Sequence, residues 1–322
     1  MATPVSGLRI ACVGNFVVDT IVRPVAALPK PGELALVDEI SVAGGGAGFT
    51  TSVALARLGA AVVAFGAVGN DRAGDDIRHW LTADRVETAY LQVVEAPTSA
   101  TVVVVSPTGE RTYLHAPGAS NEMRLEPRMA ELPGLAGIHV GAALILPGLD
   151  VEEGGVRTIR AAHERGLLTS LDTSWDSTGR WERVLPYLPY LDVFTPSLVE
   201  ARQISGQVEA ERVAEWILAR GTRTAVVHDG ARGAYVASAE FSGWVPAYAV
   251  EVVDTTGAGE CFDAGLVYGL CSDWPVIDAV RLACASGALA ATRPGAVGGV
   301  VSLDAALALA GMETPDTSRT AS

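Results

Sequence analysis

The sequence predicts an α/β fold in which a doubly wound, mostly parallel sheet carries a small β-sheet lid. The expected strands are short apolar runs, as is typical of strands that are buried on both faces. After about residue 134, strand and helix signals alternate regularly, which favours parallel β-α-β units. Two insertions, 16–42 and 98–118, carry strand and turn signals alone. We expect them to form the lid over the carboxyl ends of the main strands.

Composition limits the class of protein. The chain has 322 residues, of which 49% are hydrophobic and 19% charged, so it can bury a large core. Its net charge of −14 and its pI near 4.8 disfavour binding to nucleic acid or to an anionic membrane. A small phosphate-bearing ligand remains compatible with this charge, because backbone N–H groups and a metal ion can hold it.

The cysteines and the single lysine restrict the chemistry further. The four cysteines have no CxxC spacing, which predicts that they are buried, reduced side chains. Lys30 lies between two prolines, which argues against a Schiff base or a phosphate-loop lysine. We find neither a signal peptide nor an 18-residue lipid-compatible run. We therefore expect a cytoplasmic protein.

The elements of the first half follow in order. A strand at 8–13 ends at Gly14, and weakly alternating residues at 16–42 predict short antiparallel strands. The glycines of 44–48 precede a helix that Gly59 closes. The next expected elements are a strand at 62–65, a helix at 75–81, and a hairpin with strands at 100–106 and 111–114.

The second half completes the main domain, which we expect to comprise 8–15, 43–97 and 119–311. The expected strands are 137–146, 168–171, 193–194, 224–227 and 249–253. The expected helices are 151–165, 198–205, 209–219, 258–270, 275–292 and 303–311, with a weaker one near 180–188. The polar tail, 312–322, is predicted to be disordered.

The segment 253–265 carries the strongest chemical signal. Gly257, Ala258 and Gly259 at a helix start let backbone N–H groups converge where the helix dipole favours an anion. Glu260 follows in the first turn, where a carboxylate can take the proton of an attacking hydroxyl. Taken alone, the same glycines could simply pack a helix against a strand.

Several motifs in the same order resemble the ribokinase-type (PfkB) carbohydrate kinase family over roughly residues 8–311. The segment 254–265 (DTTGAGECFDAG) looks like its C-terminal signature, and 45–59 looks like its N-terminal glycine signature. Shorter matches are Pro31-Gly32-Glu33, Val68-Gly69-Asn70-Asp71, Gly109-Glu110-Arg111 and Thr292-Arg293-Pro294-Gly295-Ala296.

The resemblance implies a ribokinase-like fold and an ATP-dependent kinase that uses Mg²⁺ and, in many members, a monovalent cation such as K⁺. Glu260 would be the base, and Gly257, Ala258 and Gly259 the anion hole. Substrate would meet Asp19, Gly45, Gly46 and Thr50. Nucleotide would meet Ser197, Glu200, His228, Gly230, Gly233 and Cys284, with Glu200 organising magnesium through water. The cation loop would be bordered by Asp254, Thr256, Arg293 and Gly295. The family also implies a homodimer formed through the lid.

Some positions depart from the family pattern. Glu260 replaces the usual aspartate, and a misplacement of ~1 Å can cost ~100-fold in rate. Thr50 and the apolar 144–146 remove partners for a small sugar, so we infer a less polar or larger substrate than ribose. Ser197 and Cys284 also depart, and His228 stands where a threonine is usual.

Two other functions compete with a kinase. A catalytically weakened protein of this fold could bind or sense a small molecule, and nucleotide binding would separate the two. A Rossmann oxidoreductase is disfavoured, because Gly14 begins no G-x-G-x-x-G pattern. The sequence leaves two alternatives for each of two side chains. Arg111 either reaches over the crevice or adds charge to an edge strand. Asp172 either lies at the rim of the active site or has a purely structural role.

Overall fold

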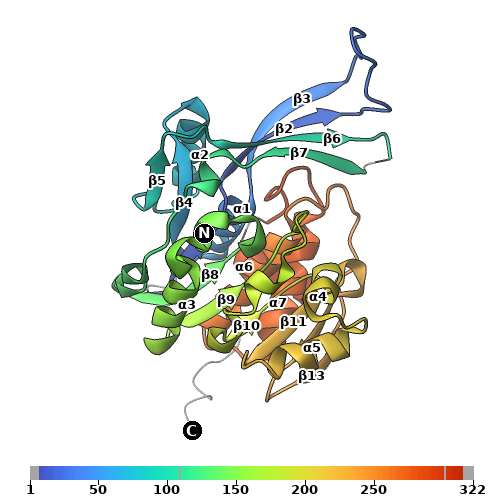
Figure 1. Ribbon diagram of the computed structural model, residues 1–322. Helices are drawn as coiled ribbons and strands as arrows, with labels where there is room; N and C mark the ends of the chain where they lie inside the picture. The colour runs from blue at the N-terminus through green and yellow to red at the C-terminus, as the bar shows by residue number, and fades with distance from the viewer. Residues whose placement is uncertain (1–6, 109, 301, 315–322) are drawn as a thin grey trace.

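The computed structural model describes residues 7–108, 110–300 and 302–314, in which thirteen strands form two sheets (Figure 1). The predicted disordered tail, 312–322, lies largely outside these residues. Among the helices described, none combines the length and the hydropathy that crossing a membrane requires. The protein is an α/β fold with a small separate sheet, as the sequence predicts.

The large sheet has nine strands. In sheet order they are β13 (Ser242–Val245), β12 (Ala234–Ala237), β11 (Thr224–His228), β10 (Val193–Phe194), β9 (Leu168–Leu171), β8 (Leu135–Val140), β1 (Arg9–Val13), β4 (Ala61–Gly69) and β5 (Leu91–Val94). The seven strands from β11 to β5 run parallel, and β12 and β13 extend one edge as antiparallel strands.

Helices cover both faces of this sheet. They are α1 (Ala47–Leu58), α2 (Arg72–Ala83), α3 (Gly154–Glu164), α4 (Leu198–Ser205), α5 (Ala210–Leu218), α6 (Ala258–Cys271), α7 (Val276–Ala290) and α8 (Leu303–Ala310). In β1, Ile10 and Cys12 join the core with α1, α2, α6, α7 and α8, whereas Ala11 and Val13 join the core with α3, α4 and α5. This double burial explains the unbroken apolar runs.

Short 3-10 helical turns connect several elements. They are Gly118–Asn121, Pro127–Glu131, Ala143–Ile145, Pro147–Leu149, Val151–Glu153, Trp181–Val184, Leu188–Tyr190 and Gly230–Arg232.

The order of the strands reverses between β1 and β8, and such a switch point is where open α/β sheets bind ligands. Helix α1 begins directly over it. A Cβ on Gly14, at the end of β1, would lie 2.7 Å from the Cα of Gly48 in α1, so a side chain there would push the helix away. The Asn15 Oδ1 atom accepts a hydrogen bond from Ala47 N at 2.8 Å and anchors the same helix start.

The small sheet forms the lid, which projects from the main body (Figure 1). Its strands, in order, are β3 (Glu39–Gly45), β2 (Val17–Arg23), β6 (Ser99–Val105) and β7 (Arg111–Ala116). Pairs β2–β3 and β6–β7 are antiparallel, as predicted for the two insertions, and a parallel β2–β6 pair joins them. Asp19, Thr101 and His115 lie in one cross-strand row, whose side chains share a face. The proposed division of the chain into domains stays a prediction.

Two predicted strands are wrong. The strand expected at 137–146 ends at Val140, because 143–149 turns into 3-10 helix and buries Leu144 and Leu146 in the core instead. The residues expected as a strand at 249–253 form a loop. The antiparallel strands β12 and β13 were not predicted.

Candidate active site

The residues predicted to form the anion hole, Gly257, Ala258 and Gly259, lie at the start of α6. Gly257 precedes the helix in the left-handed conformation, with φ 74°. A Cβ there would lie 2.8 Å from Ala296 Cα and closer still to the Ala296 carbonyl oxygen. The Cys261 thiol donates to that same oxygen at 3.4 Å. The segment around Ala296 therefore fixes the N-terminus of a 14-residue helix, whose dipole favours an anion.

Glu260 lies in the first turn of α6. Burial raises the pKa of its carboxyl above the ordinary range. Burial also raises the pKa of Asp19 in β2 to about 6; the Thr101 hydroxyl lowers it and the Glu260 charge raises it again. The lid carboxyl and the core carboxyl thus act on each other across the crevice, although 241 positions separate them in the chain.

The other predicted substrate residues surround Asp19 and the start of α1. A Cβ on Gly45 would overlap the Asp19 carboxylate, so a side chain at this position would displace that carboxylate. Gly46 has φ 85° and caps α1, and its carbonyl accepts from Thr50 N at 2.9 Å. The Thr50 side chain is buried, with 1% exposure.

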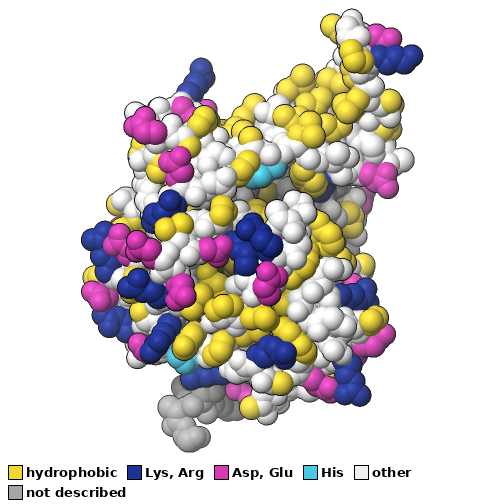
Figure 2. Space-filling model, viewed as in Figure 1, with side chains coloured by type: hydrophobic (Ala, Val, Ile, Leu, Met, Phe, Trp, Pro, Cys, Tyr) yellow, Lys and Arg dark blue, Asp and Glu magenta, His cyan; other side chains and the backbone are white. Residues whose placement is uncertain are grey.

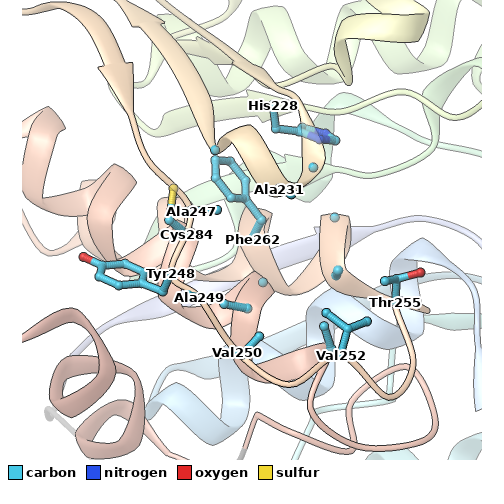
Figure 3. Close-up of a pocket in the computed structure, with 17 residues that line it drawn as sticks. His228, Ala231, Ala247, Tyr248, Ala249, Val250, Val252, Thr255, Phe262 and Cys284 are labelled. Carbon is cyan, nitrogen blue, oxygen red and sulfur yellow. The ribbon is translucent and has the colours of Figure 1, made fainter.

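An apolar cavity of about 500 Å³ adjoins the anion hole (Figure 3). The predicted nucleotide residues His228, Gly230, Gly233 and Cys284 line it together with the anion-hole residues Ala258 and Gly259. The remaining lining residues are Ala231, Ala247, Tyr248, Ala249, Val250, Val252, Thr255, Phe262, Gly287, Ala288 and Ala291. The structure therefore brings two separately predicted groups into one pocket.

The cavity suits a flat, apolar ring system. The His228 ring lies 5.6 Å from that of Phe262, centroid to centroid, and both rings are visible in Figure 3. Burial lowers the pKa of His228 to about 4, so the ring is neutral at pH 7. The sequence did not identify Tyr248, Val250 and Val252 as lining residues, because their segment is a loop and carries no motif.

Ser197 and Glu200 lie at the start of α4, close to this cavity. The Ser197 hydroxyl accepts a hydrogen bond from Glu200 N and caps the helix, and Ser197 forms a parallel bridge with His228. The Thr173 hydroxyl donates to Glu200 Oε2 at 3.0 Å, and burial raises the pKa of Glu200. Among the described residues, no group of three or more His, Cys, Asp or Glu side chains is arranged to hold a metal ion.

Asp254 organises the predicted cation loop. Its Oδ1 atom accepts from Thr256 N at 2.7 Å and its Oδ2 atom from Gly295 N at 2.9 Å. Arg293 belongs to the same segment but is exposed. Arg111 of the lid forms an ion pair with Asp254. Of the two roles open for Arg111, the structure therefore selects the one that reaches over the crevice.

Two further buried carboxyls, those of Asp172 and Asp263, lie near the candidate site and have raised pKa values. Asp263 and Asp172 are 1% and 7% exposed, and the Thr195 hydroxyl donates to Asp263 Oδ1. Burial raises the pKa of both carboxyls. Sequence reasoning singled out Asp172 but missed Asp263, although its i, i+3 spacing from Glu260 on α6 places the two on neighbouring positions of one helix face.

A helix N-terminus beside an apolar cavity, with a buried carboxyl in the first turn of that helix, is compatible with a small-molecule kinase. The profile of the pfkB family carbohydrate kinases matches residues 8–302. The chain belongs to this family, and the resemblance inferred from its motifs is confirmed. It is accordingly a phosphotransferase with an alcohol acceptor.

Individual relatives cover most of the chain. Ribokinase of Haemophilus influenzae is 26% identical over 274 residues, which are 83% of this chain and 87% of that protein. Aminoimidazole riboside kinase of Salmonella typhimurium is 29% identical over 269 residues, 79% and 83% of the two chains. The structure of Arabidopsis thaliana ribokinase complexed with ribose and ATP superposes with a TM-score of 0.79 at 21% identity, over 97% of this chain and 100% of the other.

Proposed function

We propose that the protein transfers the γ-phosphate of ATP to a hydroxyl of a sugar, sugar-like or nucleoside substrate, with Glu260 as the general base. The observation that carries this proposal is the position of Glu260. It lies in the first turn of α6, next to Gly259 on the side of the apolar cavity, and its charge acts on Asp19 on the side of the lid. A phosphate donor and an alcohol acceptor placed on these two sides would meet at this carboxylate.

In this proposal, different residues of the chain stabilise charge, orient the acceptor and remove its proton. Bound ATP and Mg²⁺ would supply the transferable phosphoryl group and neutralise its charge. The backbone N–H groups of 257–259 stabilise negative charge at the helix start. Asp19 orients the acceptor hydroxyl, and Glu260 removes its proton. The raised pKa of Glu260 suits a base that operates near neutral pH.

The residues present fit magnesium better than potassium. Mg²⁺ keeps several waters and needs only one or two protein carboxylates beside the phosphates, and half-buried Glu200 can hold such a water. Asp254 already faces the guanidinium of Arg111 and two backbone donors. A potassium ion on the same carboxylate would be repelled by that guanidinium, so the Asp254 carboxylate does not fit it.

The acceptor is proposed to be larger or less polar than ribose. Thr50 is buried, and the apolar segment 144–146 turns its leucines into the core, so neither offers the row of polar partners that a small, fully hydroxylated sugar needs. A relative named for a riboside acceptor, the aminoimidazole riboside kinase, supports including nucleosides among the candidates.

The test is ADP release with Mg²⁺ over a panel of sugars, sugar acids, nucleosides and aminocyclitols. We expect turnover by the wild-type protein and a loss of at least 100-fold in Glu260→Ala. The control Glu182→Ala, in a 3-10 turn outside the lining of the cavity, should retain wild-type turnover. If only Glu260→Asp turns over, the pocket belongs to a kinase and Glu260 is not a working base.

The alternative is a small-molecule binding or regulatory protein of the same fold. Calorimetric titration with the same panel and with ADP separates the two. Binding of a panel compound without any binding of ADP, and without turnover, would contradict the kinase proposal and favour this alternative.

We further propose a homodimer through the lid. The face of the sheet opposite Asp19 carries Ile40, Val42, Val102 and Leu114, which are 65%, 56%, 38% and 61% exposed. Figure 2 shows hydrophobic side chains gathered over the projecting sheet. An apolar surface of this kind favours association. Light scattering at micromolar concentration should give twice the monomer mass, and Val42→Asp should give the monomer; a monomeric wild type would contradict the proposal.

A further inference from the structure

Arg111 links the lid to the phosphate-binding side of the site. It begins β7, the last strand of the lid, and its guanidinium forms an ion pair with Asp254 of the main domain. A second guanidinium nitrogen donates to Thr255 Oγ1 at 3.3 Å. Thr255 lines the apolar cavity, and Gly257 of the anion hole follows two residues later.

The ion pair is largely sheltered from water. The side chains of Arg111 and Asp254 are 12% and 14% exposed, whereas most surface pairs are exposed and contribute little. Asp254 is also fixed on its own side, because Thr256 N and Gly295 N both donate to it. The Arg111 contact therefore ends on a hydrogen-bonded loop, and that loop leads directly into the start of α6.

The lid face that carries Asp19 and Thr101 is connected to Arg111 through the pairing of β2, β6 and β7. Residues Thr101 and His115 pair across β6 and β7, and Thr101 Oγ1 lies 3.0 Å from His115 Nδ1. Asp19 is paired with Thr101 across β2 and β6. Because β7 carries Arg111, a contact that holds this strand against the loop also restrains the strand that carries Asp19.

We propose that Arg111 is a positioning residue that couples the lid to the phosphate-binding loop 254–260, so that the acceptor side and the phosphate side of the site are assembled together. This inference rests on the proposed kinase function for its effect on transfer, but the coupling itself is a property of the protein without ligands. Its consequence is that transfer to the acceptor is favoured over transfer to water, since an unlatched lid leaves the reacting phosphate open to solvent.

The effect of removing a charge from the lid must be separated from the effect of losing the contact with Asp254. The lid offers a matched control for this. Arg23, in β2, forms an ion pair with Glu39 of β3 at 2.7 Å, and both side chains belong to the lid. Arg23→Gln removes a lid charge and an ion pair without touching the main domain.

The experiment compares wild type, Arg111→Gln, Arg111→Lys and Arg23→Gln by amide hydrogen exchange without ligands. We expect Arg111→Gln to raise exchange at least 10-fold both in β6–β7 and in 254–260, and Arg111→Lys to restore part of the protection. Arg23→Gln should leave 254–260 unchanged. Unchanged exchange of 254–260 in Arg111→Gln, or an equal effect of Arg23→Gln, would overturn the coupling.

A kinetic arm tests the consequence with an acceptor identified in the panel. Arg111→Gln should raise the acceptor KM at least 10-fold and raise the ratio of ATP hydrolysis to acceptor phosphorylation; Arg23→Gln should change neither. An unchanged ratio would refute the effect on transfer. If no compound in the panel is phosphorylated by the wild type, the kinase proposal fails, while hydrogen exchange still decides the coupling.

Discussion

Replacing Gly257 by alanine tests whether the anion hole depends on one backbone conformation. Gly257 has φ 74°, and a Cβ there would lie 2.8 Å from Ala296 Cα and closer to its carbonyl oxygen. The new methyl group therefore meets backbone, which moves only if the segment around Ala296 or the start of α6 moves. The substitution combines a conformational strain with an overlap.

The free-energy cost of the strain and that of the overlap can each be estimated. The left-handed conformation costs an alanine ~1–2 kcal/mol. Forcing an extra methyl group into a packed site costs a further ~1–3 kcal/mol. We expect the free energy of unfolding to fall by roughly 2–5 kcal/mol in total. A shift of the helix start by ~1 Å would lower turnover by ~100-fold.

Gly166 provides the matched control. It has almost the same φ, 73°, but nothing lies within 4 Å of a Cβ built there, and it does not line the apolar cavity. Gly166→Ala should lose only the ~1–2 kcal/mol of strain and keep wild-type kinetics. Urea unfolding and ADP release measure both effects. Wild-type activity in Gly257→Ala, with no greater loss of stability than in Gly166→Ala, would refute the reasoning.

Three further predictions concern the cavity and the carboxyls. Val252 lines the cavity and is 62% exposed, so Val252→Asp should weaken ADP binding ~10-fold in a calorimetric titration, about 1.4 kcal/mol, without destabilising the fold. The neighbouring Val253→Asp, outside the lining, should not weaken it. Because burial raises the pKa of Glu260, kcat/KM should be lost as the pH falls through a value above ~4.3, and a limb below that value would contradict the buried base. Burial also raises the pKa of Asp263, so the folded state binds this proton more tightly than the unfolded state, and the Asp263 carboxyl lowers stability as the pH rises. Asp263→Asn should therefore raise the thermal midpoint more at pH 8 than at pH 5. An equal change at both pH values would contradict this.

Much of the fold followed from local sequence because its signals are local. The apolar run of β1 and the hairpin of β6 and β7 need no distant information to be recognised. The wrong strand at 137–146 had the same apolar signal, but its second half satisfies burial by packing Leu144 and Leu146 into the core. Periodicity cannot distinguish these two ways of burying leucine.

The candidate site divides in the same way. Its residue types came from motifs, and the cavity that unites His228 and Cys284 with Gly259 agrees with their assignment to one nucleotide site, which remains a proposal. The cavity wall formed by Tyr248, Val250 and Val252 carries no motif, because a loop lines a pocket by its path through space.

The sequence by itself determined the α/β class, the lid insertions and the family, because each rests on residue types at fixed spacing along the chain. Only the tertiary structure decided which distant groups act on each other. Asp19 and Glu260 interact across the crevice, and Arg111 pairs with Asp254 over 143 positions. Such contacts depend on how the lid lies against the main domain, and electrostatic interaction depends on distance in space and on burial rather than on position in the chain.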